Sequence, residues 1–272
     1  MSGGRKNSRA GAVAHFPGLV AFTGLFYAFL YFPIIVLIAY SFNSGTRSMI
    51  WKGFGFNAYA KVFGNEAILG AALNSLIVAF VSTILATMIA TAAALALARG
   101  GSFKGKTVSF GLTTLPLIVP EIVTAVATLM FFSAIGLNVG LGNLIIAHTV
   151  FCIPFAFMPI RARLEGLDTN LEQAACDLYA TDWQAFRYVT LPLLMPGILA
   201  GATLAFVISI DDFIISLMVS GAGTTTLPVY IYGMIRQGIT PEVNAVSSIL
   251  FAISLVLISV YWFASRPGSN AK

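Results

Sequence analysis

Apolar positions in this chain run continuously over long stretches instead of alternating with polar ones. About 20 mostly apolar residues form a helix that crosses roughly 30 Å of hydrocarbon. Six stretches reach this length, at about 16–40, 67–98, 108–134, 143–160, 194–219 and 244–264. The two-residue period of a membrane β-barrel is not followed in them. The pattern predicts an all-α integral membrane protein with six transmembrane helices.

The same pattern predicts one membrane domain between two short tails. Residues 1–15 are expected to be an N-terminal tail, 16–265 the six-helix domain and 266–272 a C-terminal tail. Inside the domain, the longest interruption of the apolar pattern is residues 161–192. This connection between the fourth and fifth predicted spans is the first candidate for a functional surface.

Composition agrees with a membrane protein and excludes two other classes. Of the 272 residues, 58% are hydrophobic and only 9% are charged, whereas soluble domains carry about 25% charged residues. Mean hydropathy is +0.90. So few charges cannot keep a fold of this length dissolved, which excludes a water-soluble enzyme. Disorder is excluded as well, because a disordered chain needs low hydrophobicity and high charge.

The positions of the basic residues predict the orientation. Lys and Arg accumulate in cytoplasmic loops, and placing the N-terminus in the cytoplasm puts 11 of the 15 inside. Both termini are therefore expected to be cytoplasmic. The inside residues are Arg5, Lys6, Arg9, Arg99, Lys104, Lys106, Arg161, Arg163, Arg187, Arg266 and Lys272, and the outside ones are Arg47, Lys52, Lys61 and Arg236.

Residues 100–107 match the phosphate-binding pattern G-x-x-x-x-G-K-[ST], but their context differs from that of a nucleotide site. In a phosphate-binding loop this turn follows a buried strand and opens a helix. Here it follows the run 91–98, rich in Ala and Leu, at the inner end of the second predicted span. We expect a short basic turn, and any ATP must then be bound by another chain.

The connection 161–192 contains two helical patterns. Leu171, Ala174, Ala175 and Leu178 have the i, i+3, i+4, i+7 spacing of one helical face. Thr181 and Gln184 then form a capping box, and the second helix is expected to stop before Pro192. From the pattern alone, the first helix can lie in the lipid headgroups, pack under the bundle or seat in a groove of a partner protein.

A resemblance favours the partner groove. Residues 171–180, followed by Leu191-Pro192 and Pro196-Gly197, resemble the EAA loop of ABC-importer permeases, with two departures: Gln173 stands at the motif Glu and Tyr179 at the motif Gly. In that family the loop is the coupling helix that docks on a cytoplasmic ATPase. The coupling residues that the resemblance implies are Glu172, Gln173, Ala174, Ala175, Asp177, Leu178, Tyr179 and Ala180.

Two adjacent carboxylates, Asp211 and Asp212, lie within the fifth predicted span. Ionisable groups at this depth are costly and usually face a cavity or a partner. Ser209, Asp212 and Ser216 share one helical face, while Asp211 points about 100° away. A salt bridge or capping contact would explain a single Asp. For the pair, with the adjacent Phe213, we favour a pathway for a cation.

The remaining ionisable groups of the spans are isolated in the sequence. Glu121 follows two prolines near the middle of the third predicted span, where it can line the pathway or pair with a polar group on another helix. His15 and His148 have no metal-ligating neighbours at helical spacing, so no metal site is expected. The chain offers no set of side chains for covalent catalysis.

A second resemblance concerns the cargo. Residues 209–213, Leu227-Pro228, Ile231-Tyr232 and 241–245 resemble the permease subunits of spermidine/putrescine importers. The resemblance implies a type I importer permease in the bacterial inner membrane that is not itself an enzyme and binds no cofactor. Its implied partners are a homologous second permease, two ATPase subunits that bind ATP and Mg²⁺, a substrate-binding protein outside and membrane lipid, but no nucleic acid.

Two alternatives remain open at this point. The same class of importer can carry another cargo, such as an amino acid, an opine or another organic solute. A self-contained secondary transporter is the other alternative, but such folds often show internal repeats. No convincing repeat relates residues 16–134 to residues 143–264.

Overall fold

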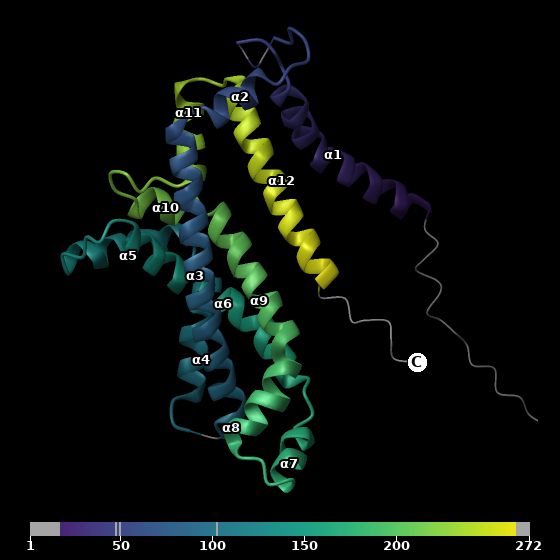
Figure 1. Ribbon diagram of the computed structural model, residues 1–272, viewed down its shortest axis with the longest axis vertical. Coiled ribbons are helices and arrows are strands. Elements are labelled where there is room, and N and C mark those ends of the chain that lie inside the picture. The colour runs from purple at the N-terminus through teal and green to yellow at the C-terminus, as the bar shows by residue number, and fades with distance from the viewer. Residues whose placement is uncertain (1–16, 47, 49, 102, 265–272) are drawn as a thin grey trace, which may run out of the picture.

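The computed structural model describes residues 17–264 except 47, 49 and 102 (Figure 1). The two predicted tails, His15 and Arg47 lie outside the described residues. Every regular element in the described part of the chain is helical, and its one β contact is an isolated bridge between Asn43 and Phe54. The elements are α1 (Pro17–Ser41), α2 (Asn57–Phe63), α3 (Glu66–Arg99), α4 (Lys106–Thr114), η2 (Leu115–Leu117), α5 (Glu121–Ala134), α6 (Leu141–Glu165), α7 (Asn170–Asp177), α8 (Asp182–Ala185), η3 (Phe186–Thr190), α9 (Leu191–Asp211), α10 (Ile214–Val219), α11 (Leu227–Gln237) and α12 (Pro241–Ala264).

Four of the six predicted spans correspond to helices long and apolar enough to cross a membrane. These cover Gly18–Ser41, Glu66–Arg99, Leu141–Glu165 and Asp182–Asp211. The last predicted span corresponds to α12, which is apolar over Pro241–Val256. The described residues thus confirm a multi-helix membrane fold, and the count of six crossings stays a prediction.

The third predicted span, 108–134, is not one straight helix. The segments Lys106–Leu117 and Glu121–Ala134 meet at an angle of 107°. Pro120 has an extended ψ of 133° at the start of α5, and proline both lacks a backbone N–H and restricts the residue before it. The bend turns α5 away from the axis of the bundle, so that it projects to one side and packs on α10 (Figure 1).

Helices α3, α6 and α9 pack side by side and form the centre of the molecule (Figure 1). Small residues at four-residue spacing, Gly197, Gly201 and Ala205, let α9 approach α6 closely, as small residues do between membrane helices. A Cβ atom on Gly201 would lie 2.5 Å from the carbonyl oxygen of Ala156. The hydrophobic core between these three helices consists of Ala86, Ala90, Ala94, Leu97, Cys152, Ala156, Phe157, Ile160, Leu164, Leu194 and Ala205.

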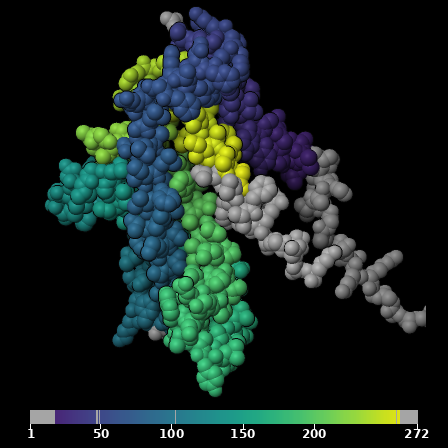
Figure 2. Space-filling view, in the orientation of Figure 1, coloured from purple at the N-terminus to yellow at the C-terminus, as the bar shows by residue number. Residues whose placement is uncertain are grey.

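The two ends of the bundle are closed by short helices. Helices α2 and α11 cover one end, and the ion pair between Lys61 Nζ and Glu242 Oε1, 2.7 Å long, joins α2 to α12 there. Helices α7 and α8 form the opposite end, called the loop end below (Figure 1). Helix α1 packs on α12 at the side of the molecule, and its side chains are exposed or half-buried from Gly18 to Tyr40 (Figure 2).

The predicted stop before Pro192 is wrong. Helical structure runs from Asp182 to Asp211, with a π-helical turn at Phe186–Thr190 and Pro192 in the first turn of α9. A proline ring collides with the carbonyl of the residue four positions earlier in a regular α-helix. The wider π-helical turn lies at that position, and the helix continues through the proline.

Candidate functional site

The first predicted site, the motif helix α7, presents an apolar surface at the loop end. Leu171 is 46% exposed and Leu178 is 81% exposed. Ala174 between them is exposed, and Ala175 is half-buried. An exposed apolar helical face of this kind is a candidate interaction surface.

Tyr179 has the backbone conformation that the motif glycine permits. Its φ is +63°, and it is the one non-glycine residue with positive φ in the described part of the chain. Its side chain is 96% exposed, so packing does not hold it in place. The departure from the motif therefore preserves the turn, at the steric cost that a Cβ atom has in the left-handed region.

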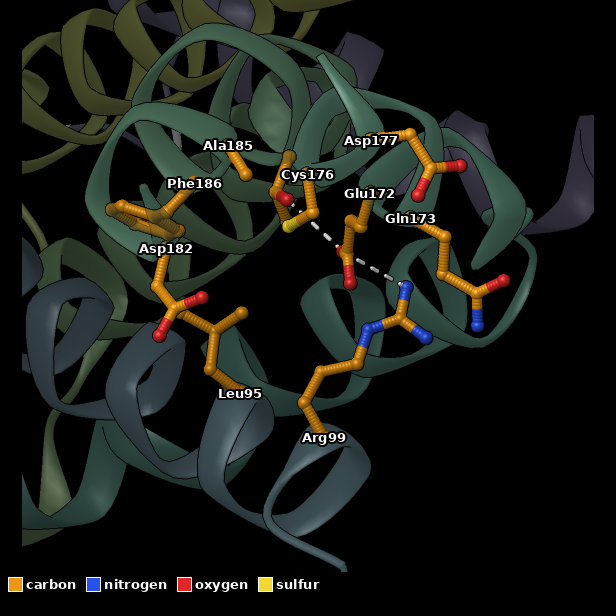
Figure 3. A pocket seen from close by; sticks show the side chains of 10 residues that line it. Leu95, Arg99, Glu172, Gln173, Cys176, Asp177, Asp182, Ala185 and Phe186 are labelled. Carbon is orange, nitrogen blue, oxygen red and sulfur yellow. Dashed lines mark hydrogen bonds and ion pairs between the residues drawn. The ribbon is translucent and has the colours of Figure 1, made fainter. Parts of the chain in front are cut away.

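Glu172, predicted to act in coupling, faces the bundle rather than the exposed surface. Its Oε1 accepts a hydrogen bond of 2.9 Å from Thr190 Oγ1 and lies 3.2 Å from Arg99 Nη2 (Figure 3). These contacts tie α7 to the C-terminal end of α3 and to the π-helical turn. Sequence reasoning missed both Arg99 and Thr190, which are 73 and 18 residues from Glu172.

A cavity of about 600 Å³ lies beside this ion pair (Figure 3). Its lining residues come from α3, α7, α8 and η3, and include Gln173, Asp177 and Asp182. The predicted capping box is confirmed at its edge: Thr181 N–H donates to Gln184 Oε1 at 2.8 Å, and Gln184 N–H donates to Thr181 Oγ1 at 3.4 Å. The box marks the start of α8 at Asp182.

The phosphate-loop pattern at residues 100–107 forms a turn between two helices. It begins directly after α3 and ends in the first turn of α4, which starts at Lys106, in agreement with the expectation of a short basic turn. Lys106 Nζ, the group that would reach a phosphate, donates to the carbonyl of Gly101 at 3.0 Å. Lys106 thus stabilises the turn that precedes it, and its Nζ points to a backbone carbonyl of this turn.

The second predicted site lies at a break in the fifth predicted span. Helix α9 ends at Asp211 and α10 begins at Ile214. Asp212 has an extended ψ of 126°, and its Oδ1 accepts the backbone N–H of Ser216 at 2.8 Å. This contact satisfies an orphan amide in the first turn of α10. The capping alternative considered for one intramembrane Asp is therefore confirmed for Oδ1.

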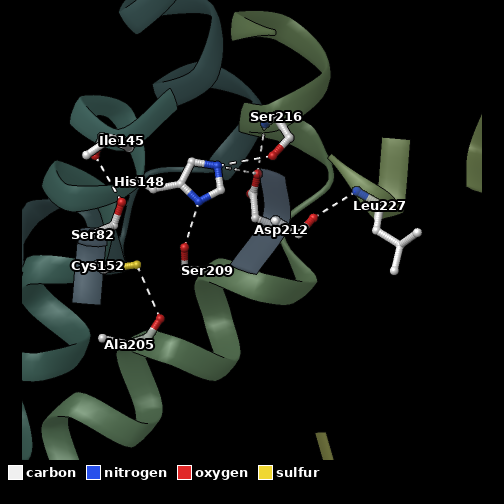
Figure 4. A network of polar contacts seen from close by, with 10 residues as sticks. Ser82, Ile145, His148, Cys152, Ala205, Ser209, Asp212, Ser216 and Leu227 are labelled. Carbon is white, nitrogen blue, oxygen red and sulfur yellow. Dashed lines mark hydrogen bonds and ion pairs between the residues drawn. The ribbon is translucent and has the colours of Figure 1, made fainter. Parts of the chain in front are cut away.

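His148, which the sequence showed as an isolated residue, lies at the centre of this break. Its Nδ1 is 2.8 Å from Ser209 Oγ, and its Nε2 is 3.1 Å from Ser216 Oγ and 3.4 Å from Asp212 Oδ1 (Figure 4). The side chains of His148 and Asp212 are 2% and 1% exposed. The sequence contained one signal that could have identified His148 as a site residue: an ionisable residue within a membrane span is a functional candidate.

The two adjacent aspartates face different surroundings, but the reason is the break and not a helical step of 100°, because α9 ends at Asp211 and Asp212 has an extended backbone. Asp212 is buried against α6, whereas Asp211 is exposed. Asp211 borders a groove of about 370 Å³ between α9 and α12, where Ser247 and Ser254 are the other polar residues. A carboxylate exposed at this depth needs water or a polar partner.

The other two predicted site residues lie near the same break. Glu121 is the first residue of α5 and interacts with Asp212, so the bend in the third span brings a second carboxyl to the site. The ring of Phe213 lies 4.9 Å from that of Tyr232, between centroids. Among the described residues, no group of three or more His, Cys, Asp and Glu side chains forms a metal site.

Comparison with known proteins gives one family and several close relatives. Residues 88–266 match the family described as binding-protein-dependent transport system inner membrane component. The spermidine/putrescine transport system permease protein PotC of Haemophilus influenzae is 37% identical over 250 residues, which are 92% of this chain and 97% of the relative. The putrescine transport system permease protein PotI of Escherichia coli K12 is 33% identical over 257 residues, 92% of each chain.

Solved structures share the fold at low sequence identity. A chain of a bacterial ABC transporter for import of the acidic polysaccharide alginate aligns with a TM-score of 0.75 at 16% identity, covering 96% of this chain and 99% of the other. The MetNI methionine ABC transporter aligns with a TM-score of 0.62 at 21% identity, covering 74% and 98%. The fold is that of ABC-importer permeases.

Proposed function

Because the chain belongs to the family of binding-protein-dependent transport system inner membrane components, we propose that it forms one half of an ATP-driven polyamine importer. The observation that supports this cargo is the identity of 33–37% to PotC and PotI over 92% of this chain. The other half is a homologous second permease. The complex is located in the bacterial inner membrane, with both termini of this chain in the cytoplasm.

The pathway residues are Asp211, Asp212, Phe213 and Glu121. A polyamine has two or more strongly hydrated ammonium groups, which must exchange water for other polar partners as they enter the membrane. Carboxylates supply charge-assisted hydrogen bonds, and aromatic faces contribute about 0.5–2 kcal/mol through cation–π contact. Two kinds of group that bind ammonium therefore meet near the break between α9 and α10.

The loop end transmits the ATPase cycle. The exposed face of α7, with Ala174, Ala175 and Leu178, seats on one of two ATPase subunits, which bind ATP and Mg²⁺. Glu172 fixes α7 to α3 through Arg99 instead of touching the partner. This chain binds no cofactor and catalyses no reaction. A substrate-binding protein delivers the cargo on the outer side.

The proposal is tested by uptake of labelled putrescine and spermidine into proteoliposomes that contain the whole complex, with and without internal ATP. The double variant Asp211→Asn, Asp212→Asn keeps side-chain volume and removes both charges. A hydrogen bond to a charged group contributes about 1.5–3 kcal/mol, so we expect uptake to fall at least about tenfold. Stimulated ATP hydrolysis should fall less, and assembly should be normal.

Glu66→Gln is the matched control, since it removes one exposed carboxylate at the far end of α3. Full uptake in the double variant would show that the pair is structural. ATP-dependent uptake of an amino acid or another organic solute, without uptake of either amine, would contradict the polyamine assignment but support the assignment as an importer. The alginate and methionine transporters share this fold, so the fold alone does not set the cargo. Uptake without ATP would indicate a secondary transporter.

A further inference from the structure

One imidazole ring spans both sides of the break in the fifth predicted span. Ser209 belongs to the last turn of α9, and Ser216 belongs to α10. The two ring nitrogens of His148 contact these two hydroxyls at 2.8 and 3.1 Å (Figure 4). A serine hydroxyl can donate or accept, so both contacts are satisfied in either neutral tautomer of the histidine. His148 thereby fixes α9 and α10 relative to each other and to α6.

In the tautomer with its proton on Nε2, the same ring faces one oxygen of Asp212 as a donor and leaves the other oxygen available. Oδ1 is held by the Ser216 backbone N–H at 2.8 Å and lies 3.4 Å from His148 Nε2. Oδ2 is buried, and within the described residues it contacts no hydrogen-bond donor. A buried polar atom without a partner is costly, and Glu121, the adjacent ionisable group, is another carboxyl. The Glu121 carboxyl interacts with Asp212, so the two groups can share a proton when no cargo is present. An ammonium group is the donor that would suit both carboxylates at once.

We infer that His148 is a positioning residue, which holds Asp212 so that Oδ2 can receive an ammonium group of the cargo. The inference rests on the proposed amine pathway. It assigns the two oxygens of one carboxylate to different tasks: Oδ1 caps α10, and Oδ2 binds substrate. It also explains why a histidine lies at 148, because few side chains have two hydrogen-bonding atoms that reach hydroxyls on both sides of the break.

The alternative is that His148 only packs the core, and two amide variants separate these roles. In His148→Gln the amide can occupy the Nε2 position, next to Ser216 and Asp212. In His148→Asn it can occupy the Nδ1 position, next to Ser209, and the contact with Asp212 is lost. A positioning role predicts that the apparent KM for putrescine uptake rises in His148→Asn by about tenfold, as for loss of roughly one charge-assisted contact, and rises less in His148→Gln. A packing role predicts equal effects, confined to assembly.

Two further variants make the experiment independent of folding at position 148. Ser216→Ala removes the hydroxyl beside Nε2 and keeps the backbone cap, so KM should rise by about fivefold. Cys152→Ser is the matched control, one helical turn along α6 in the same contact with α9, where Sγ lies 3.5 Å from the Ala205 carbonyl. It should leave KM unchanged.

The outcomes are distinguishable in the same proteoliposomes. Absence of amine uptake by the wild-type complex would overturn the proposed cargo and this inference with it. Wild-type uptake together with unchanged KM in His148→Asn and Ser216→Ala would overturn this inference alone. A raised KM in these two variants, normal KM in Cys152→Ser and partial rescue in His148→Gln would support it.

Discussion

Single residues decide whether a motif that departs from its family pattern still folds in the same way. Tyr179 stands where the EAA loop has glycine, and it keeps the left-handed backbone with φ of +63°. A tyrosine in this region has steric strain that glycine does not have. The turn after α7 is therefore set by the surrounding structure and not by a local preference of Tyr179.

This strain can be measured by comparing two substitutions. Tyr179→Gly and Tyr179→Ala both remove an exposed ring, but alanine keeps the strained Cβ. We expect the glycine variant to be more stable than the alanine variant by about 1 kcal/mol, seen as a higher midpoint in thermal unfolding of the purified complex. Equal midpoints would contradict the left-handed conformation.

A second residue-scale prediction concerns the ion pair between Lys61 and Glu242, which lies in the first turn of α12 at the end of the bundle covered by α2 and α11. Burial raises the pKa of the Glu242 carboxyl, but hydrogen bonds from Lys61 and Thr240 and the charge of Lys61 bring the pKa below its ordinary value. A carboxyl with a lowered pKa stabilises the fold above its unfolded pKa of about 4.3, and this contribution is lost as the pH falls through the folded pKa.

Removing the charge of Lys61 tests the direction of this pH dependence of stability. Lys61→Met should lower the unfolding midpoint at pH 7 slightly, because a partly exposed ion pair contributes about 0.2–1 kcal/mol. The difference from the wild type should shrink as the pH is lowered below about 4. Lys61→Arg keeps the charge and should unfold like the wild type. A difference that is independent of pH would mean that the lysine stem, and not its charge, stabilises this end.

At the scale of elements, the contact between α6 and α9 depends on glycine rather than on large apolar side chains. A Cβ atom at Gly201 would meet the backbone of Ala156 at 2.5 Å, whereas one at Gly70 in α3 would have no heavy atom within 4 Å. Backbone atoms cannot move aside as the end of a side chain can. The close approach of α6 and α9 therefore requires glycine at position 201, whereas no contact requires it at position 70.

Alanine at these two positions should have opposite effects. Gly201→Ala forces the helices apart and should destabilise the protein by about 1–3 kcal/mol. Gly70→Ala removes a flexible residue from an α-helix without a clash and should be neutral or stabilising by about 0.5–1 kcal/mol. Thermal unfolding of both variants in detergent provides the comparison. Similar losses of stability would argue against the close approach of α6 and α9.

The second prediction at this scale concerns docking through α7. Replacing Ala174 and Ala175 with arginine places bulky charge on the face beside Leu178, and should abolish co-purification with the ATPase while membrane insertion stays normal. Leu178→Ser should weaken association by about tenfold, since burial of a leucine side chain contributes about 1.5–3 kcal/mol. Lys104→Glu, an exposed charge change at the same end, is the control. Normal binding and transport in the double arginine variant would overturn the docking assignment.

At the scale of the whole molecule, the orientation in the membrane follows from charge and can be tested with thiols. Cys176 is exposed at the loop end and Cys152 is buried. An impermeant thiol reagent should therefore label Cys176 only after the inner leaflet is breached. In a Cys176→Ser background, cysteines at 5 and 270 should behave in the same way, and one at 47 should react from outside. The reversed pattern would overturn the positive-inside argument.

Features that depend on composition or on neighbouring residues could be predicted from the amino-acid sequence. Long apolar runs established the membrane class, and the spacing of Thr181 and Gln184 established the capping box. Each of these is a property of one helix, so the periodicity of the backbone is sufficient to predict it.

Features that join distant segments depend on how the helices pack and could not be predicted from the amino-acid sequence. The 107° bend brings Glu121 to the break, the π-helical turn carries the chain through Pro192, and Glu172 turns inward to Arg99. His148 meets Ser209 and Ser216 across 61 and 68 residues. Which polar groups pair inside a membrane depends on how whole helices pack, because each buried group must find its partner on a neighbouring helix. The local pattern of one helix does not specify that neighbour.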